Sequence, residues 1–210
     1  QVAGSLRRAL MFSGALDEAE AIHREWNLGA ALIDDQRARG LNDLAAMQLA
    51  RGDLTAAKGT LEQAKSALAA CEDTERARTQ NYIRVNAWRA GLEDPPPMDL
   101  EADIKKMIDE GMLPDLLGQL EALGRTDAET LKRWYEAHYL AANFSAIHLT
   151  ILLRPLAVRA ADVAHQPWAR AAIDRVRAHL RPELTGEAPV AALEAMSQGN
   201  GHPWLRLLPY

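Results

Sequence analysis

The amino-acid sequence predicts an all-α fold, and three observations support that prediction. Alanine and leucine are the commonest residues, aromatic residues make up only 5% of the chain, and valine, isoleucine and threonine are scarce. Alanine loses no side-chain entropy in a helix and β-branched residues lose some, so this composition favours helices. No run of alternating apolar and polar residues is long enough to predict a sheet. The 210 residues are enough for a continuous hydrophobic core.

Two segments near the N-terminus share a pattern centred on glycine. When Gly14 and Gly52 are superimposed, both segments have leucine eight residues before the glycine, leucine two after it and alanine five after it. The two glycines lie 38 residues apart, which is the length of one helical hairpin. Glycine allows a tight turn between antiparallel helices, and the leucine beyond it packs into the angle between them. The pattern therefore predicts neighbouring helical hairpins.

These segments resemble the tetratricopeptide repeat. The better copy spans residues 41–68 and has these residues at the spacings of that family: Leu44, Ala45, Gly52, Leu54, Ala57, Leu61 and Ala64. A looser copy begins near Glu75 and contains Gly91, so the resemblance covers about residues 3–92. The spacing exceeds the family's usual ~34 residues, and Leu10 and Gln48 replace an aromatic residue. The resemblance implies hairpins stacked as a right-handed α-solenoid, as in the helical sensor domains of bacterial regulators.

Helix-boundary signals predict the remaining elements in order. One helix covers residues 54–70, with Leu54, Ala57, Leu61, Ala64 and Leu68 on its buried face, and the next covers 74–92. The prolines at 95–97 end this region, so we expect helical repeats at 1–94 and a C-terminal helical region at 98–210, packed on the solenoid or continuing it.

Proline, glycine and capping residues mark the predicted ends of the helices in the C-terminal region. We expect one helix from Asp99 to Gly111 and a second from Pro114 to Gly124. Thr126 and Glu129 form a capping box at the start of a third helix. Pro155 and Pro167 break the chain beyond it, and the helix after Pro167 ends near Leu180. The segment at 203–208 is apolar enough to dock back onto the protein. In that arrangement the tail fills the groove of its own scaffold.

Charge and cysteine content exclude several classes of function. A net charge of −5 argues against nucleic acid and anionic membrane surfaces as partners. Cys71 is the only cysteine, which excludes an intramolecular disulfide and indicates a cytoplasmic setting. No apolar stretch reaches the ~18 residues of a membrane span. The first residue is Gln1, and we expect the chain to be part of a longer protein.

No motif in the sequence predicts a catalytic centre. Phosphate-binding glycine loops, the Rossmann fingerprint, the zinc helix of metalloproteases and the nucleophile elbow are all missing from the sequence. The enzymatic alternative is a helical metalloenzyme with a carboxylate-bridged metal pair, because Glu20–His23 and Asp162–His165 each place an acid and a histidine on one helix face. Two further inward carboxylates are needed, and the sequence does not identify them. We therefore predict neither enzymatic activity nor a bound cofactor or metal.

The favoured function is the binding of another protein or peptide by a sensor or scaffold module of a larger regulatory protein. In stacked hairpins the first helix of each pair lines the concave face. The predicted partner-binding groove comprises Arg8, Met11, Phe12, Asn42, Leu49, Asn81, Trp88 and Arg89. Side-chain amides hold an extended backbone, and tryptophan and arginine supply anchoring contacts. The partner, the pathway and the oligomeric state are left open by the sequence.

Overall fold

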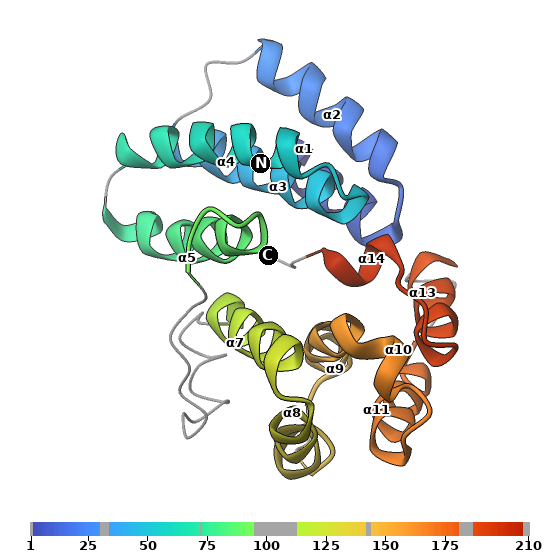
Figure 1. Ribbon diagram of the computed structural model, residues 1–210. Coiled ribbons are helices and arrows are strands. Elements are labelled where there is room, and N and C mark those ends of the chain that lie inside the picture. Colours follow the sequence, from blue (N-terminus) through green and yellow to red (C-terminus); the bar gives the residue numbers. More distant parts are fainter. Residues whose placement is uncertain are drawn as a thin grey trace.

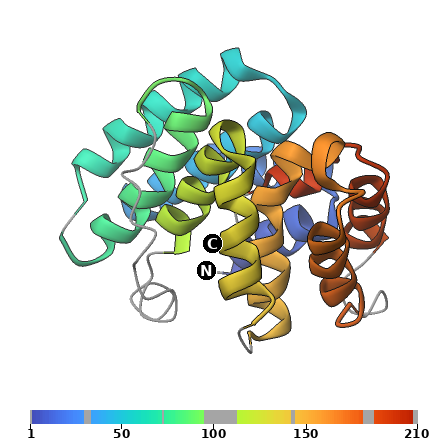
Figure 2. The ribbon, with the colours of Figure 1, turned by 60° about the horizontal axis from the view of Figure 1, so that its bottom comes forward.

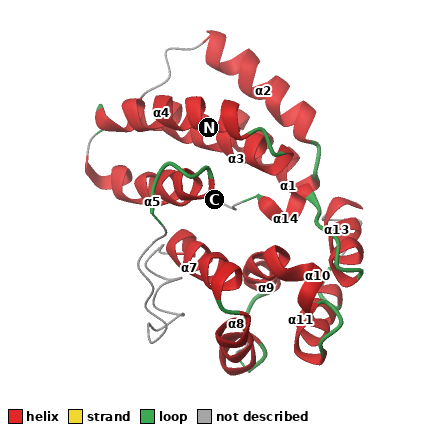
Figure 3. Ribbon diagram, viewed as in Figure 1, coloured by secondary structure: helices red, strands yellow, loops and turns green. Residues whose placement is uncertain are grey.

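The computed structural model describes residues 2–29, 34–71, 73–94, 113–141, 144–180 and 187–207. All regular structure in these ranges is helical, which confirms the predicted all-α class (Figure 3). None of the helices described has both the length and the hydropathy needed to cross a membrane.

The N-terminal part consists of helical pairs joined by glycine turns. Its helices are α1 (Val2–Ser13), α2 (Leu16–Gly29), α3 (Asp34–Arg51), α4 (Leu54–Ala69) and α5 (Asp73–Arg89) (Figure 1). Gly14 and Gly52 have φ angles of 88° and 81°, in the left-handed region that glycine tolerates. In each turn the N–H of the residue after the glycine donates to a carbonyl five residues back, at 2.9 Å from Ala15 to Leu10 and from Asp53 to Gln48. The predicted role of the two glycines as tight helix ends is confirmed.

The turn geometry recurs once more. Gly91, after α5, has a φ of 74°, and the N–H of Leu92 donates to the carbonyl of Ala87 at 2.8 Å. Helix α3 packs on both α4 and α5, and their small and apolar side chains form one core cluster. That cluster includes Ala45, Leu61 and Ile83.

The predicted face of α4 is correct except at its first residue. Ala57, Leu61, Ala64 and Leu68 are buried, but Leu54 is 50% exposed, so its predicted burial is wrong. Leu54 directly follows the N-cap Asp53, whose side chain accepts a hydrogen bond from the N–H of Ala56 at 3.0 Å. Its side chain lines the cavity described below.

The C-terminal part is a set of shorter helices. They are α7 (Leu113–Thr126), α8 (Ala128–Trp134), the π-helical turn η1 (Tyr135–Tyr139), α9 (Ala146–Leu153), the 3-10 helix η2 (Arg154–Arg159), α10 (Ala160–Val163), α11 (Pro167–Arg177), α13 (Glu187–Ser197) and α14 (Pro203–Arg206). The helix predicted between Asp99 and Gly111 lies outside the described residues.

One boundary prediction needs correction. The cap of α8 is Asp127, which accepts from the N–H groups of Glu129 and Thr130, whereas the predicted cap Thr126 donates its hydroxyl back to Ala122 in the preceding helix. Carboxylate and hydroxyl groups both cap helices, and here the residue one position later has the extended backbone that a cap requires. The predicted break at Pro155 is confirmed: α9 ends at Leu153, and η2 begins at Arg154 with Pro155 in its first turn, where the missing N–H costs no hydrogen bond.

The two parts of the chain share one core. A single cluster of buried side chains includes Met11, Met47 and Val85 from the N-terminal helices together with most buried residues of the C-terminal ones. Helix α7 packs beside α5 (Figure 2), and α14 returns to the middle of the molecule, where it contacts α3 and η2 (Figure 1). Trp204, Leu205 and Leu207 are buried there, at 4%, 3% and 1% exposure. The tail that the sequence predicted to dock is therefore packed against the first helix of the second hairpin.

Candidate functional site

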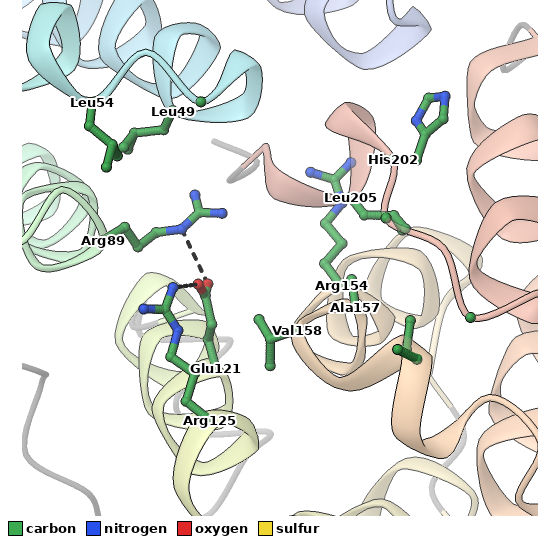
Figure 4. Close-up of a pocket in the computed structure, with 15 residues that line it drawn as sticks. Leu49, Leu54, Arg89, Glu121, Arg125, Arg154, Ala157, Val158, His202 and Leu205 are labelled. Atoms are coloured by element: carbon green, nitrogen blue, oxygen red, sulfur yellow. Dashed lines mark hydrogen bonds and ion pairs between the residues drawn. The ribbon is translucent and has the colours of Figure 1, made fainter.

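A cavity of about 570 Å³ lies where the α3–α4 turn, α5, α7, η2 and the segment leading into α14 meet (Figure 4). Its lining consists of Leu49, Gly52, Leu54, Arg89, Glu121, Arg125, Arg154, Ala157, Val158, Ala160, Ala161, Gly199, Gly201, His202 and Leu205. The volume falls within the range of about 300–1,000 Å³ that is usual for ligand pockets. Because the cavity is bounded by elements from both parts of the chain, it forms only when they pack together.

Arginine side chains dominate the polar part of the lining. Glu121 pairs with two of them: one of its oxygens lies 3.2 Å from the Nε of Arg89, and the other accepts a hydrogen bond from a terminal nitrogen of Arg125 at 2.7 Å. The side chains of Arg89 and Glu121 are only 8% and 9% exposed, so water screens this pair weakly. The lining thus holds three guanidinium groups and one carboxylate.

Arg154 connects the cavity to the C-terminal segment. It is 6% exposed, and one of its terminal nitrogens donates to the carbonyl oxygen of Leu207. Its guanidinium carbon lies 4.3 Å from the ring centroid of Trp204, a cation–π contact. Burial and, as a smaller contribution, the nearby positive charge of Arg89 together lower the pKa of Arg154 to about 9. At neutral pH the group still carries its charge, in a site whose local potential is positive.

Apolar side chains form the other part of the lining. Four large apolar side chains of the described residues are exposed, and two of them, Leu54 at 50% and Val158 at 39%, line this cavity. They come from α4 and η2, two elements that lie apart in the sequence. Exposed apolar side chains beside charged groups in one cavity are typical of a binding site.

The polar groups of the lining are few in kind. It contains arginine, glutamate, one histidine and apolar residues, but no hydroxyl or thiol side chain that would serve as a nucleophile. Burial lowers the pKa of His202, which favours its neutral form at pH 7. His202 also accepts a hydrogen bond from the N–H of Trp204 at 3.2 Å, so it caps α14.

The structure divides the predicted groove residues into two groups. Leu49 and Arg89 line the cavity, and the neighbouring Trp88 lies 4.8 Å from the guanidinium carbon of Arg125, another lining residue. Met11 and Asn42 are 2% and 1% exposed, so they lie in the core.

The remaining predicted residues lie away from the cavity. Asn42 accepts a hydrogen bond from Asn86 at 2.9 Å, and Arg8 lies 3.7 Å from the buried carboxylate of Asp43, which also pairs with Arg7. Burial raises the pKa of Asp43 against the opposing effect of these two arginines. Asn81 is half-buried, and the side chain of Phe12 lies outside the described residues.

The acid–histidine pairs have structural partners of their own. Burial raises the pKa of Glu20, but ion pairs with Arg51 and Arg24 outweigh it and lower that pKa overall. His23 is 4% exposed, and its burial, with the charge of Arg7, lowers its pKa to about 4.

The second acid–histidine pair, Asp162 and His165, also shows no shared site. The carboxylate of Asp162 lies 3.1 Å from a terminal nitrogen of Arg159, and His165 is exposed. Among the described residues, no group of three or more histidine, cysteine, aspartate or glutamate side chains is placed to hold a metal ion.

The sequence interpretation missed Glu121, Arg125, Arg154 and Val158. These residues belong to α7 and η2, where no repeat signals a shared surface. Only the excess of arginine over acid between residues 154 and 181 hinted at a positively charged site.

Compared with known proteins, the chain matches no family model, no curated protein and no solved structure. The functional inference therefore depends on the geometry of this chain alone.

Proposed function

We propose that the protein is a protein- or peptide-binding module of helical hairpins, the sensor or scaffold part of a regulatory protein, and that it binds its partner in the cavity described above. The observation that carries this proposal is the combination of arginine and exposed apolar side chains around one cavity of about 570 Å³. Arginine is enriched at the hot spots of protein interfaces, and exposed apolar side chains gain free energy when a partner removes them from water.

The proposal includes a stacking of hairpins like that of tetratricopeptide repeats. Three glycine turns of the same geometry, at Gly14, Gly52 and Gly91, follow one another at spacings of 38 and 39 residues. Helix α3 contacts α2 on one side and both α4 and α5 on the other, as the first helix of a middle repeat would. Arrays of this kind are common peptide-binding scaffolds.

In this interpretation, the C-terminal helices close one end of the array. The partner then occupies the space between the second hairpin and η2, where Leu54 and Val158 line the cavity. Catalysis is not part of the proposal, since the lining holds no nucleophile and no described metal cluster accompanies it.

Selection from a random-peptide display library tests the proposal. Wild-type protein should enrich a family of related peptides, and Val158→Trp should lose binding to them, because the larger ring fills the cavity. Val190→Trp is the matched control: Val190 is exposed to a similar extent, 41% against 39%, but does not line the cavity. Equal binding by both variants, or failure of the wild type to enrich any peptide, would contradict the proposed function.

A further inference from the structure

We infer that the partner places a side-chain carboxylate between the arginines of the cavity, with apolar residues on both sides of that acidic residue. This inference rests on the proposed function and deepens it, since it specifies the chemistry of the bound segment. It is carried by the charges of the lining, by the position of Glu121 and by the two apolar walls.

The first step is the balance of charge. Three guanidinium groups and one carboxylate line the cavity, so the lining carries a formal excess of positive charge. Like charges held close together in a weakly screened site repel, and the repulsion is relieved by an anion placed between them. Burial is the main cause of the lowered pKa of Arg154, and the charge of Arg89 lowers that pKa in the same direction, as such repulsion requires.

Glu121 shows which anion the site accommodates. Its two carboxylate oxygens are divided between Arg89 and Arg125, so one carboxylate already bridges two arginines at this wall. Figure 4 shows Arg89 and Arg154 on opposite sides of the cavity, reaching in from α5 and η2. One terminal nitrogen of Arg89 donates to the side-chain oxygen of Asn86 at 3.5 Å, and one of Arg154 donates to the carbonyl of Leu207. A second carboxylate between Arg89 and Arg154 repeats the arrangement that Glu121 makes with Arg89 and Arg125. Planar guanidinium groups match carboxylate oxygens in geometry as well as charge.

The apolar walls indicate where the carboxylate lies in the partner. Leu49 and Leu54 line the cavity on the side of the α3–α4 turn, whereas Ala157 and Val158 line it on the side of η2. Figure 4 shows Arg89 and Glu121 between these two apolar sides, and Arg154 on the same element as Ala157 and Val158. A peptide crossing the cavity meets an apolar wall before and after the charged centre, so an internal acidic residue with apolar neighbours fits better than a chain terminus.

Three synthetic peptides test the inference. The probes are acetyl-Ser-Leu-Glu-Leu-Ser-amide, the same peptide with glutamine in place of glutamate, and the glutamine peptide with a free C-terminal carboxylate. Each is titrated into ¹⁵N-labelled protein, and the Nε–Hε signals of the arginine side chains are followed by NMR. The signals are assigned from single Arg→Lys variants.

The glutamate peptide should bind about tenfold more tightly than the glutamine peptide, the effect of one charge-assisted hydrogen bond. It should also shift the side-chain signals of Arg89 and Arg154. Equal affinities for the two amidated peptides, or unmoved arginine signals, would overturn the inference. If only the free C-terminus improves binding, the side-chain carboxylate is likewise ruled out.

Paired surface variants supply the control. Leu54→Glu places a fixed carboxylate at the cavity and should abolish the advantage of the glutamate peptide. Leu6→Glu adds the same charge at a leucine of similar exposure, 47% against 50%, which does not line the cavity, and should leave that advantage intact.

Failure of the inference is distinguishable from failure of the proposed function. Peptides from the display selection that bind the wild type but not Val158→Trp, and that carry no acidic residue, would keep the function and remove the inference. A selection that yields no peptide, together with no response to any of the three probes, would remove both.

Discussion

Replacing Gly14 and Gly52 by alanine, one at a time, separates two reasons for glycine at the hairpin turns. Both residues have positive φ angles, of 88° and 81°, so alanine is strained at either position. Only Gly14 is also crowded: a Cβ at that position would overlap the Cβ of Ala188 in α13, well inside the 3.0 Å below which something must shift. At Gly52 nothing lies within 4 Å of the added carbon. The two substitutions therefore share the conformational cost and differ in the steric one.

The expected magnitudes follow from these environments. An alanine forced into the left-handed region costs roughly 1–2 kcal/mol, offset in part by the reduced freedom of the unfolded chain. We expect Gly52→Ala to lower the free energy of unfolding by ~1 kcal/mol. Overpacking adds about 1–3 kcal/mol, so Gly14→Ala should cost about 2–4 kcal/mol. In a domain of this size each kcal/mol lowers the melting temperature by about 2–4 °C.

Thermal and urea denaturation of the purified variants measure both effects. Gly91→Ala is a second open-space control, with φ of 74° and no atom within 4 Å, and should match Gly52→Ala. Gly59→Ala controls for the added methyl group itself. This glycine lies within α4 with open space around it, so alanine there should stabilise the protein by roughly 1 kcal/mol. Equal losses at Gly14 and Gly52 would refute the close approach of α13 to the first turn, and no loss at Gly52 would refute the left-handed turn.

Two further predictions concern a buried histidine and the C-terminal segment. His23 has its folded-state pKa lowered to about 4 from an ordinary 6.5, so the unfolded chain binds its proton more readily between these values. The free energy of unfolding should therefore be constant above pH 6.5 and fall by up to ~3 kcal/mol toward pH 4. Urea denaturation across this pH range should show a shallower fall for His23→Gln than for the wild type. Parallel curves for the two proteins would contradict the assignment of this pH dependence to His23. Truncation after Asn200 removes Trp204 and its buried neighbours and exposes the face of α3 that they cover. The truncated protein should oligomerise or aggregate, whereas a monomer of unchanged stability in light scattering would show that α14 contributes little to the core.

Short sequence patterns were sufficient to predict the helices and turns near the N-terminus. The glycine at each turn, and the apolar spacing of α4 from Ala57 to Leu68, are properties of short segments, and such properties are readable from sequence. The exceptions are also local in origin. Leu54 continues the apolar spacing, but it lies at the first residue of its helix, where the neighbouring helix has already ended. Apolar periodicity in the sequence identifies the buried face of a helix. It does not show over what length of that face the neighbouring helix packs.

The site was less predictable because it is assembled from distant segments. Arg89 pairs with Glu121 across a gap of 32 positions, and Arg154 reaches the carbonyl of Leu207 across 53. Nothing in the spacing of these residues marks them as neighbours. Of the predicted groove residues, Leu49 and Arg89 line the cavity, but the inner wall assumed for the groove is covered at Asn42 by Asn86 and the packed α5. The accessible cavity lies instead at the junction between the N-terminal and C-terminal helices.

In the proposed complex, that junction couples binding to the packing of the C-terminal segment. Arg154 lines the cavity and also holds α14, through the carbonyl of Leu207 and the ring of Trp204. In the proposed complex, a carboxylate near Arg154 favours its charged form and so stabilises the guanidinium in the position that contacts α14. Coupling of this kind is reciprocal, so docking of α14 strengthens ligand binding by the same free energy with which the ligand strengthens docking. The C-terminal segment is then part of the binding site and not its competitor, because it fixes Arg154 in the wall of the cavity while leaving the space beside Leu54 and Val158 to the partner.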